Sequence, residues 1–324
     1  MAADEPRAWA TPMVTRSRLV LEVASELVAI LDQPYNQAKV LLRVQGGPDW
    51  PLCLFGSSTI EGVDAVVKGE AALAIINPAS ALALAWRGKG IFKSPQPVRV
   101  VSVIPSQDSY AFAVRPETGL TRFEEIGERR VPLRVALRGQ KDHWLHYSLD
   151  DIAVASGFAL DEIVAWGGEL RREGLLPYPD GPKFEALKRG EFDAIFDEAA
   201  NVWVESAIAA GMTILPLAEP TVRRLEEMGY QRSVLRTGDP RWPSLKREVL
   251  SIDFSGWPIF VREDAPDLLV TQVCAAILAR KHLIPWQGEG PLPVEQMCRN
   301  LPDNPQLVPL HRAAELFWRE QGFL

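Results

Sequence analysis

Two segments that lie far apart in the sequence repeat one short pattern, a helix followed by a Gly-Glu turn and a buried strand. The first is KGEAALAIINP, from Lys68 to Pro78, and the second is RGEFDAIFDEA, from Arg189 to Ala199. Apolar runs such as AALAII are typical of strands buried on both faces of a parallel sheet. Gly-Glu turns are common in α/β proteins, but both copies also end in polar residues, where open α/β sheets bind ligands. The pattern predicts an α/β fold with two similar units.

A third segment places a polar loop between a strand and a helix. Residues 133–137 (LRVAL) are predicted as a strand, residues 144–156 as a helix, and RGQKDH connects them. A loop that opens a helix aims free backbone N–H groups at an anion. We expect Arg138 to clamp a carboxylate, although a solvated turn with a surface ion pair is the alternative. The candidate ligand residues of this loop are Arg138, Gln140, Asp142 and His143.

Two extended segments are predicted to connect the two units. Residues 98–114 contain two predicted strands, and residues 249–261 (VLSIDFSGWPIFV) again mix strand residues with a Gly and a Pro. If both segments cross, the first lobe comprises residues 1–110 and 255–324, the second lobe comprises 111–254, and a ligand cleft lies between them. We expect each lobe to be a mostly parallel sheet flanked by helices. Two hinge crossings would let the lobes close over a ligand by changing few backbone angles.

Polar residues that follow the predicted strands of the first lobe are further ligand candidates. Ser57 and Ser58 offer hydroxyls and backbone donors, although an N-cap role is the alternative. Asn77 and Ser80 lie on either side of Pro78, where an amide could bind a carboxylate or an amino group. Turn chemistry alone also selects an Asn-Pro pair. These four residues are interpreted as the first lobe's contribution to the cleft.

The second lobe and the return crossing supply the remaining candidates. Asp197, Glu198 and Asn201 follow the strand FDAIF, where two adjacent acids beside a cleft suit an ammonium group or a water network. Their alternative role is at a helix N-terminus, where the helix dipole favours negative charge. Trp257 lies between a Gly and a Pro and either stacks on the ligand or belongs to the core at the hinge.

Composition and missing motifs exclude several functional classes. The formal net charge of -7 argues against nucleic-acid binding, which needs clustered excess Lys and Arg. The three cysteines lie far apart and form no CxxC pair, so neither a disulfide framework nor a zinc site is predicted. His143 and His146 have no third clustered ligand, and we expect no metal and no other cofactor. The apolar stretch at 71–84 is interrupted by polar residues, which argues against a membrane-embedded transporter.

Four stretches, in order, carry a resemblance to a known family. They are residues 56–82 (GSSTIEGVDAVVKGEAALAIINPASAL), 109–126 (SYAFAVRPETGLTRFEEI), 184–200 (FEALKRGEFDAIFDEAA) and 310–322 (LHRAAELFWREQG). The chain resembles the TAXI-type solute receptors of TRAP transporters, which implies the type 2 periplasmic-binding-protein fold. Two ligand loops depart from the family: TPMVTRSR replaces its Gly-rich first loop, and RGQKD replaces a Gly-Ser-Gly-Thr loop. By position, Thr15 and Arg16 of the first loop are candidate ligand residues.

The resemblance implies a transport function. It predicts a monomeric solute-binding protein that captures a small carboxylate-containing ligand by hinge closure, performs no chemistry, and serves membrane subunits of a TRAP transporter. It also implies a periplasmic location. The N-terminal segment MAADEPRAWATPMV has no basic stretch followed by an apolar one, which leaves a cytoplasmic location as the alternative.

Two other functional classes stay open at this point. An enzyme on the same fold, such as a decarboxylase or a relative of pyrimidine-synthesis enzymes, could act on a small aromatic or keto acid. His143 and Asp197 would then serve as its acid and base. A cytoplasmic effector-sensing module would need a DNA-binding or signalling domain, and no basic helix-turn-helix segment is found. Solute binding is the favoured interpretation.

Overall fold

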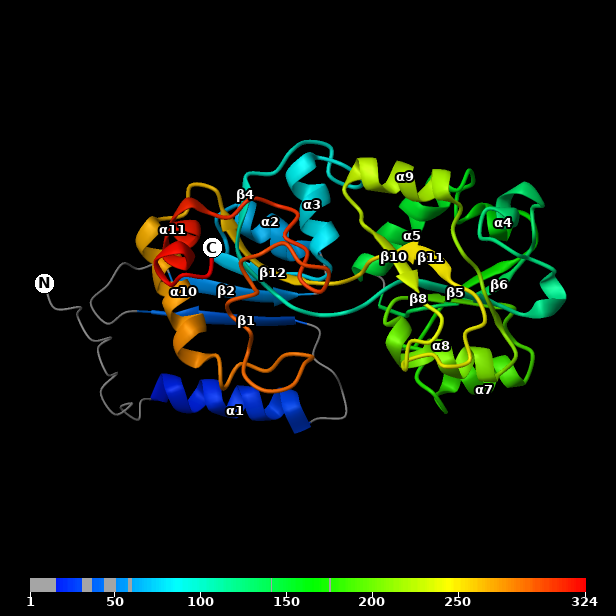
Figure 1. Cartoon of the computed structure of the whole chain (residues 1–324), viewed down its shortest axis with the longest axis horizontal. Coiled ribbons are helices and arrows are strands. Elements are labelled where there is room, and N and C mark those ends of the chain that lie inside the picture. Colours follow the sequence, from blue (N-terminus) through cyan, green and yellow to red (C-terminus); the bar gives the residue numbers. More distant parts are fainter. Residues whose placement is uncertain (1–15, 31–36, 44–50, 58–59, 141, 175) are drawn as a thin grey trace, which may run out of the picture. The chain divides into compact units, whose positions relative to one another are not determined.

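The structure, a computed structural model, describes residues 16–30, 37–43, 51–57, 60–140, 142–174 and 176–324. It is a mixed α/β fold in which two five-stranded sheets are flanked by helices (Figure 1). The chain divides into a small unit, residues 1–38, and a large unit, residues 39–324. The small unit contains helix α1 (Arg16–Ile30). The α/β fold class predicted from the repeated pattern is confirmed.

The first sheet consists of β1 (Gln37–Leu42), β2 (Leu52–Ser57), β3 (Leu73–Ile75), β4 (Val98–Ile104) and β12 (Trp257–Arg262). Its strand order is β1-β2-β3-β12-β4. β2 and β3 are parallel, and β12 pairs antiparallel with both β3 and β4. β2, β3 and β4 therefore share one direction and β12 runs against them. The AALAII segment predicted as a strand contains β3.

Helices cover the first sheet on both faces. They are α2 (Glu61–Val67), α3 (Ala79–Arg87), α10 (Asp267–Arg280) and α11 (Arg312–Glu320). Because strand side chains alternate between faces, Phe260 packs into the core that contains α2 and α3. Its neighbours Ile259 and Val261 pack into the core that contains α10 and α11.

The second sheet consists of β5 (Ala111–Val114), β6 (Arg134–Leu137), β7 (Glu169–Arg172), β8 (Ala194–Asp197) and β9 (Thr213–Ile214). Its strand order is β7-β6-β8-β5-β9. β6 is parallel to β7 and β8, whereas β5 pairs antiparallel with β8 and β9. One strand, β5, therefore runs against the others, as β12 runs against β2, β3 and β4 in the first sheet. The predicted strands LRVAL and FDAIF correspond to β6 and β8.

Helices also cover both faces of the second sheet. They are the 3-10 helix η1 (Pro116–Thr118), α4 (Glu125–Glu128), α5 (Trp144–Ala155), α6 (Glu162–Ala165), α7 (Pro182–Lys188), α8 (Ala200–Ala209) and α9 (Glu219–Met228). Ala111 and Ala113 face the core formed with α7 and α8. Phe112 and Val114 face the core formed with α5 and α9. The helix predicted over 144–156 is α5.

Two short segments connect the sheets: the first crossing, residues 105–110, leads from β4 to β5, and the second crossing, residues 253–256, leads from β11 (Val249–Ile252) to β12. β11 pairs antiparallel with β10 (Arg232–Leu235). The crossings lie side by side, since Phe254 N donates to Asp108 O at 3.0 Å and Ser109 forms an antiparallel bridge with Asp253.

The antiparallel strand of each sheet is the one that follows a crossing. A short connection enters the next sheet at the edge where its parallel strands end, so the entering strand must run back against them. The carboxyl ends of β3 and β8 consequently lie beside the crossings, as the pairings Ile259–Ile75 and Ala111–Asp197 require. The lobe boundaries and the interlobe cleft expected from the sequence stay a prediction.

Candidate functional site

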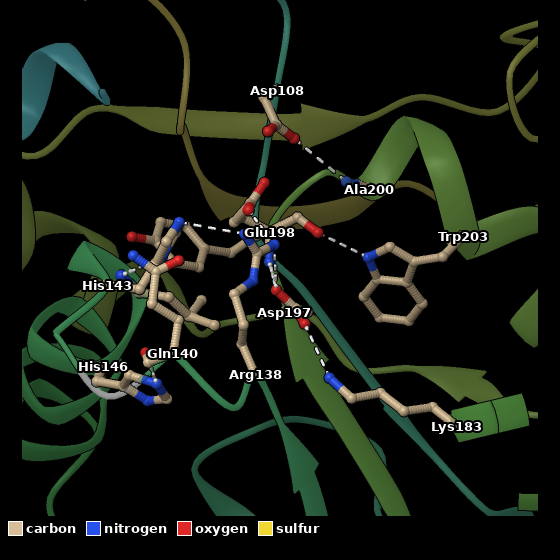
Figure 2. A network of polar contacts seen from close by, with 12 residues as sticks. Asp108, Arg138, Gln140, His143, His146, Lys183, Asp197, Glu198, Ala200 and Trp203 are labelled. Atoms are coloured by element: carbon tan, nitrogen blue, oxygen red, sulfur yellow. Dashed lines mark hydrogen bonds and ion pairs between the residues drawn. The ribbon is translucent and has the colours of Figure 1, made fainter. Parts of the chain in front are cut away.

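A network of buried charges lies at the carboxyl ends of β6 and β8. The two strands are parallel neighbours in the register Ala136–Ile195, which brings Arg138 and Asp197 opposite each other. Arg138 Nη2 donates to Asp197 Oδ1 at 3.0 Å and also to the Glu198 carboxylate, as Figure 2 shows. Lys183 Nζ of α7 lies 3.6 Å from Asp197 Oδ2. We call Arg138, Lys183, Asp197 and Glu198 the charge network.

The charge network is compensated internally. All four residues are buried, and Asp197 is fully inaccessible to solvent. Burial lowers the pKa of Arg138, but the charges of Asp197 and Glu198 outweigh it and raise that pKa. Burial also lowers the pKa of Lys183, against the opposing effect of Asp197. Two cations thus face two acidic groups, the arrangement that makes buried charge tolerable.

His143 and His146 have structural contacts beside the network. His143 caps α5, because Leu145 N donates to its Nδ1 at 3.1 Å. Arg138 Nη1 lies 3.1 Å from His143 Nε2. Burial and then the positive charge of Arg138 hold the pKa of His143 well below its usual value. His146 Nε2 lies 2.9 Å from Gln140 O, which fixes the loop after β6.

The first crossing brings a further carboxyl group to the charge network. Figure 2 shows Asp108 beside Glu198. Asp108 Oδ1 also accepts from Ser109 N at 2.6 Å and from Ala200 N, in the first turn of α8, at 3.2 Å. Burial, followed by the charge of Glu198, raises the pKa of Asp108 well above its ordinary value. The pKa of Glu198 is raised as well, chiefly by burial.

A cavity of about 620 Å³ opens beside the two crossings. It takes residues from both crossings, from α9 and β10, and from three loops. We call it the crossing cavity, and its lining residues are Gln107, Asp108, Ser109, Glu226, Tyr230, Gln231, Arg232, Ser233, Val234, Arg241, Asp253, Ser255, Pro302 and Asp303. Small-molecule sites typically measure about 300–1,000 Å³, so this volume suits a small ligand.

Charged groups of both signs line the crossing cavity. Arg232 Nε donates to Glu226 at 2.7 Å, and Arg241 Nη2 donates to Asp239 at 2.7 Å. Burial raises the pKa of Asp253 to about 7, although hydrogen bonds from Ser255 oppose the increase. No ion pair within 4.0 Å involves Asp108 or Asp253 among the residues that the structure describes. The raised pKa values of both acids reduce the negative charge of the wall, and Asp253 is mostly neutral below about pH 7.

The structure brings together part of the predicted ligand set. Arg138, His143 and Asp197 lie in or against the charge network, and Gln140 contacts His146. Asn77 Nδ2 donates to Phe254 O and Gly256 O, both at 3.3 Å, and so anchors the second crossing to the end of β3.

The other predicted ligand residues lie elsewhere. Ser57 ends β2, Ser80 is buried in the first turn of α3, Asp142 and Asn201 are exposed, and Trp257 begins β12 with 39% of its surface exposed. Arg16 begins α1 in the small unit, while Thr15 and Ser58 lie outside the described residues. None of the predicted residues that the structure describes lines the crossing cavity. Their role in ligand binding stays a prediction.

Sequence reasoning missed the acids of the crossings. Asp108 lies in IPSQDSY and Asp253 in SIDFSG, two polar interruptions of otherwise apolar extended segments. Both segments were interpreted as crossings, but their acids were not considered as site residues. A polar cluster inside a segment that must pass between two sheets was the available signal.

No protein-family model matches the sequence, and no curated protein matches it. Among similar solved structures is the alkanesulfonate-binding protein SsuA from Xanthomonas axonopodis pv. citri bound to MOPS, at 14% identity and a TM-score of 0.32. That match covers 68% of this chain and 59% of SsuA.

Two further similar structures come from other organisms. MatC from Rhodopseudomonas palustris with bound malate is 13% identical with a TM-score of 0.37, covering 81% of this chain and 79% of MatC. A TctC solute binding protein from Polaromonas is 15% identical with a TM-score of 0.35, covering 68% of this chain and 67% of that one.

Two searches of the described residues gave negative results. Nowhere among them do three or more His, Cys, Asp or Glu side chains gather as a metal ion would require. No helix in the described part of the chain has both the length and the apolar character needed to cross a membrane.

Proposed function

We propose that this protein is a solute-binding protein that holds a small carboxylate-containing molecule in the crossing cavity and does not transform it. The observation that carries the proposal is that both crossings line one cavity of about 620 Å³. The crossings connect the two sheets, so a ligand that contacts Ser109 and Ser255 also contacts the segments through which the sheets would rotate. Ligand binding in the crossing cavity is therefore coupled directly to closure of the two sheets over the ligand.

The carboxylate part of the proposal is supported by the cavity wall. Arg232 and Arg241 line the cavity with guanidinium groups, which match carboxylates in geometry and charge. A ligand carboxylate would compete for them with their present partners, Glu219 and Glu226 for Arg232 and Asp239 for Arg241. The raised pKa values of Asp108 and Asp253 favour their neutral forms, which can donate a hydrogen bond to an anion instead of repelling it. Arg138, which the sequence predicted as the carboxylate clamp, is instead hydrogen-bonded to Asp197 and Glu198.

The non-catalytic part of the proposal is supported by the state of the expected acid and base. His143 is buried, has a lowered pKa and accepts a hydrogen bond from the backbone of α5. Asp197 is fully buried between Arg138 and Lys183. Both groups serve the fold in these positions. The sequence resemblance extends the proposal to a periplasmic monomer that delivers its ligand to the membrane subunits of a TRAP-type transporter.

The test begins with native mass spectrometry of freshly purified protein and continues with a thermal-shift panel of dicarboxylates, amino acids and aromatic acids. A ligand at a hundredfold excess over its Kd stabilises the folded state by about 2.7 kcal/mol, so its shift is easily measured. In a Gln231→Trp variant the indole fills the crossing cavity, and we expect the shift to disappear. The control Thr237→Trp, in the exposed turn after β10, should retain it.

Three outcomes contradict the proposal. An equal shift in both tryptophan variants places the ligand outside the crossing cavity. A thermal-shift panel in which no carboxylate stabilises the protein contradicts a carboxylate-containing ligand. Conversion of a bound acid to a product, followed by mass spectrometry, replaces solute binding with catalysis.

A further inference from the structure

Besides the two crossings, a direct contact between side chains joins the two sheets. Residues 88–97 connect α3 to β4, and within them Phe92 stacks on Trp144 at the start of α5, with the ring centroids 6.5 Å apart. Trp144 is fully buried, and Phe92 is 8% exposed. Stacked rings at this separation attract each other in addition to burying apolar surface. Because α3 covers the first sheet and α5 covers the second, this aromatic pair bridges the two sheets.

Two glycines allow a close approach at the same contact. A Cβ on Gly229, which follows α9, would lie 3.3 Å from Leu84 Cδ1 and 3.4 Å from Arg87 Cδ of α3. A Cβ on Gly90 would lie 2.8 Å from Leu84 Cδ2 and 2.9 Å from Asp151 Oδ2 of α5. Leu84 is fully buried between the two glycines. The backbones therefore pack more closely here than residues with side chains would permit.

The contact is apolar and reaches the wall of the crossing cavity. Leu84, Phe92, Trp144 and Tyr230 all belong to one continuous core, which extends from α3 to α5 and α9. Tyr230 also lines the crossing cavity, and its hydroxyl donates to Asp151 Oδ2 at 2.8 Å. The same hydrogen bond thus links the cavity wall to the carboxylate that Gly90 approaches.

We propose that Leu84, Gly90 and Phe92 form a clasp that fastens the first sheet to α5 and α9 and that opens without unfolding either sheet. The crossings are short, and a rotation of one sheet against the other needs only a few of their backbone angles to change. The clasp opposes that rotation, because separating Phe92 from Trp144 returns apolar surface to water. Its packing contacts break and reform without any chemical step.

Opening of the clasp changes access to the crossing cavity. Tyr230 directly follows Gly229 at the end of α9, so a rotation that moves Gly229 away from Leu84 also displaces one wall of the cavity. The clasp therefore regulates entry to the cavity, whatever the cavity binds. Its test needs no bound molecule, so a failure of the clasp leaves the proposed solute binding standing.

The experiment is thiol labelling of the full chain with DTNB under native conditions, quantified for each cysteine by peptide mass spectrometry. In a Leu84→Cys variant the new thiol lies beneath Gly90 and Gly229 and reacts only when the clasp opens. Cys274 is fully buried in the core of α10 and α11 and reacts only when that core unfolds, so it is the internal reference. With each rate divided by its value in urea, we expect Leu84→Cys to react about tenfold or more faster than Cys274, since local opening costs less than unfolding.

A second substitution then weakens the clasp. Phe92→Ala, added to Leu84→Cys, should raise the labelling rate of the clasp thiol about tenfold or more and leave that of Cys274 nearly unchanged, because one buried ring is lost from the contact. Phe92→Leu retains most of the apolar surface and should raise the rate only slightly. Phe158→Ala is the matched control: Phe158 is 5% exposed and packs on Phe123 and Trp166 beside the second sheet, so its loss should not affect the clasp thiol.

Three results overturn the proposal. Equal normalised rates for Leu84→Cys and Cys274 would mean that the contact opens only when the chain unfolds. An unchanged rate in Phe92→Ala would mean that the aromatic pair does not hold the contact closed. An increase in Phe158→Ala as large as that in Phe92→Ala would reduce the effect to general destabilisation. Ala83→Cys, also fully buried beside Gly229, is the second probe in case the loss of the Leu84 side chain unfolds the protein.

Discussion

The strand ends of the second sheet and the two crossings both hold carboxyl groups away from solvent, but they balance the negative charge differently. At the strand ends, Asp197 is opposed by Arg138 at 3.0 Å and by Lys183 at 3.6 Å. At the crossings, Asp108 and Asp253 receive hydrogen bonds from backbone N–H groups and from Ser255. Cations stabilise the first region, whereas protons and neutral donors stabilise the second.

This difference indicates what each region is suited to do. A carboxylate paired with Arg stays charged over a wide pH range, so the charge network is a rigid support for the ends of β6 and β8. A carboxyl group without a cation changes its charge when the pH changes or when a ligand arrives. The crossings, through which any movement between the sheets must pass, contain the responsive groups.

The largest expected effect comes from removing the cation of the rigid region. Arg138→Met keeps much of the side-chain volume but leaves Asp197 and Glu198 without their guanidinium partner. We expect a loss of about 3–5 kcal/mol in the free energy of unfolding, measured by urea denaturation at pH 7. Arg122→Met, which removes a partly exposed arginine paired with Glu125 and Glu128, should cost less than about 1 kcal/mol. Equal losses in the two variants would mean that the charge network adds no more stability than surface pairs.

Much of the fold was predictable from the sequence because its signals are local. The repeated helix, Gly-Glu turn and strand placed β3 and β8 correctly, and it indicated that polar residues follow both strands. The two crossings were also expected, from extended segments that contain Gly and Pro. Each of these features is encoded within about a dozen consecutive residues.

The site was less predictable because its contacts join distant segments. Arg138 was expected to bind a ligand carboxylate, and in the structure it binds Asp197 and Glu198, about 60 residues away in the chain. That pairing depends on β6 and β8 being neighbours, which the order of strands in the sequence does not reveal. Asp108 gains its importance only where the two crossings meet, and no local pattern reports such a meeting.

The second effect in size tests the responsive region. The pKa of Asp253 is raised from 3.8 to about 7 in the folded protein, so folding is weakened as the pH rises between about 4 and 7. Allowing for its partial contact with solvent, we expect this acid to remove about 2–3 kcal/mol of stability over that range. Asp253→Asn has no carboxyl group at this position to ionise. Its free energy of unfolding should therefore fall less between pH 5 and pH 8 than that of the wild type.

The measurement is urea denaturation of the wild type and of Asp253→Asn at both pH values. Asn retains one acceptor oxygen for Ser255, so the variant is compared with itself across pH instead of with the wild type at one pH. Asp264→Asn is the control, because that exposed acid is paired with Arg262 and has a lowered pKa. Parallel profiles of stability against pH for the wild type and Asp253→Asn would show that ionisation of this carboxyl group costs no stability. The crossings would then not differ from the strand ends in how they respond to pH.

The smallest effect concerns uncharged hydrogen bonds that anchor the second crossing to the first sheet. Asn77 donates to Phe254 O and Gly256 O and holds the second crossing to β3 without any charge. Asn77→Ala leaves both carbonyls without this donor and should cost about 1–2 kcal/mol at pH 5 and at pH 8 alike. Asn201→Ala, an exposed position in the first turn of α8, should change stability by less than about 0.5 kcal/mol. A pH-dependent loss in Asn77→Ala would mean that anchoring and ionisation of the crossings are coupled, and that the second crossing responds to pH as one unit with the first sheet.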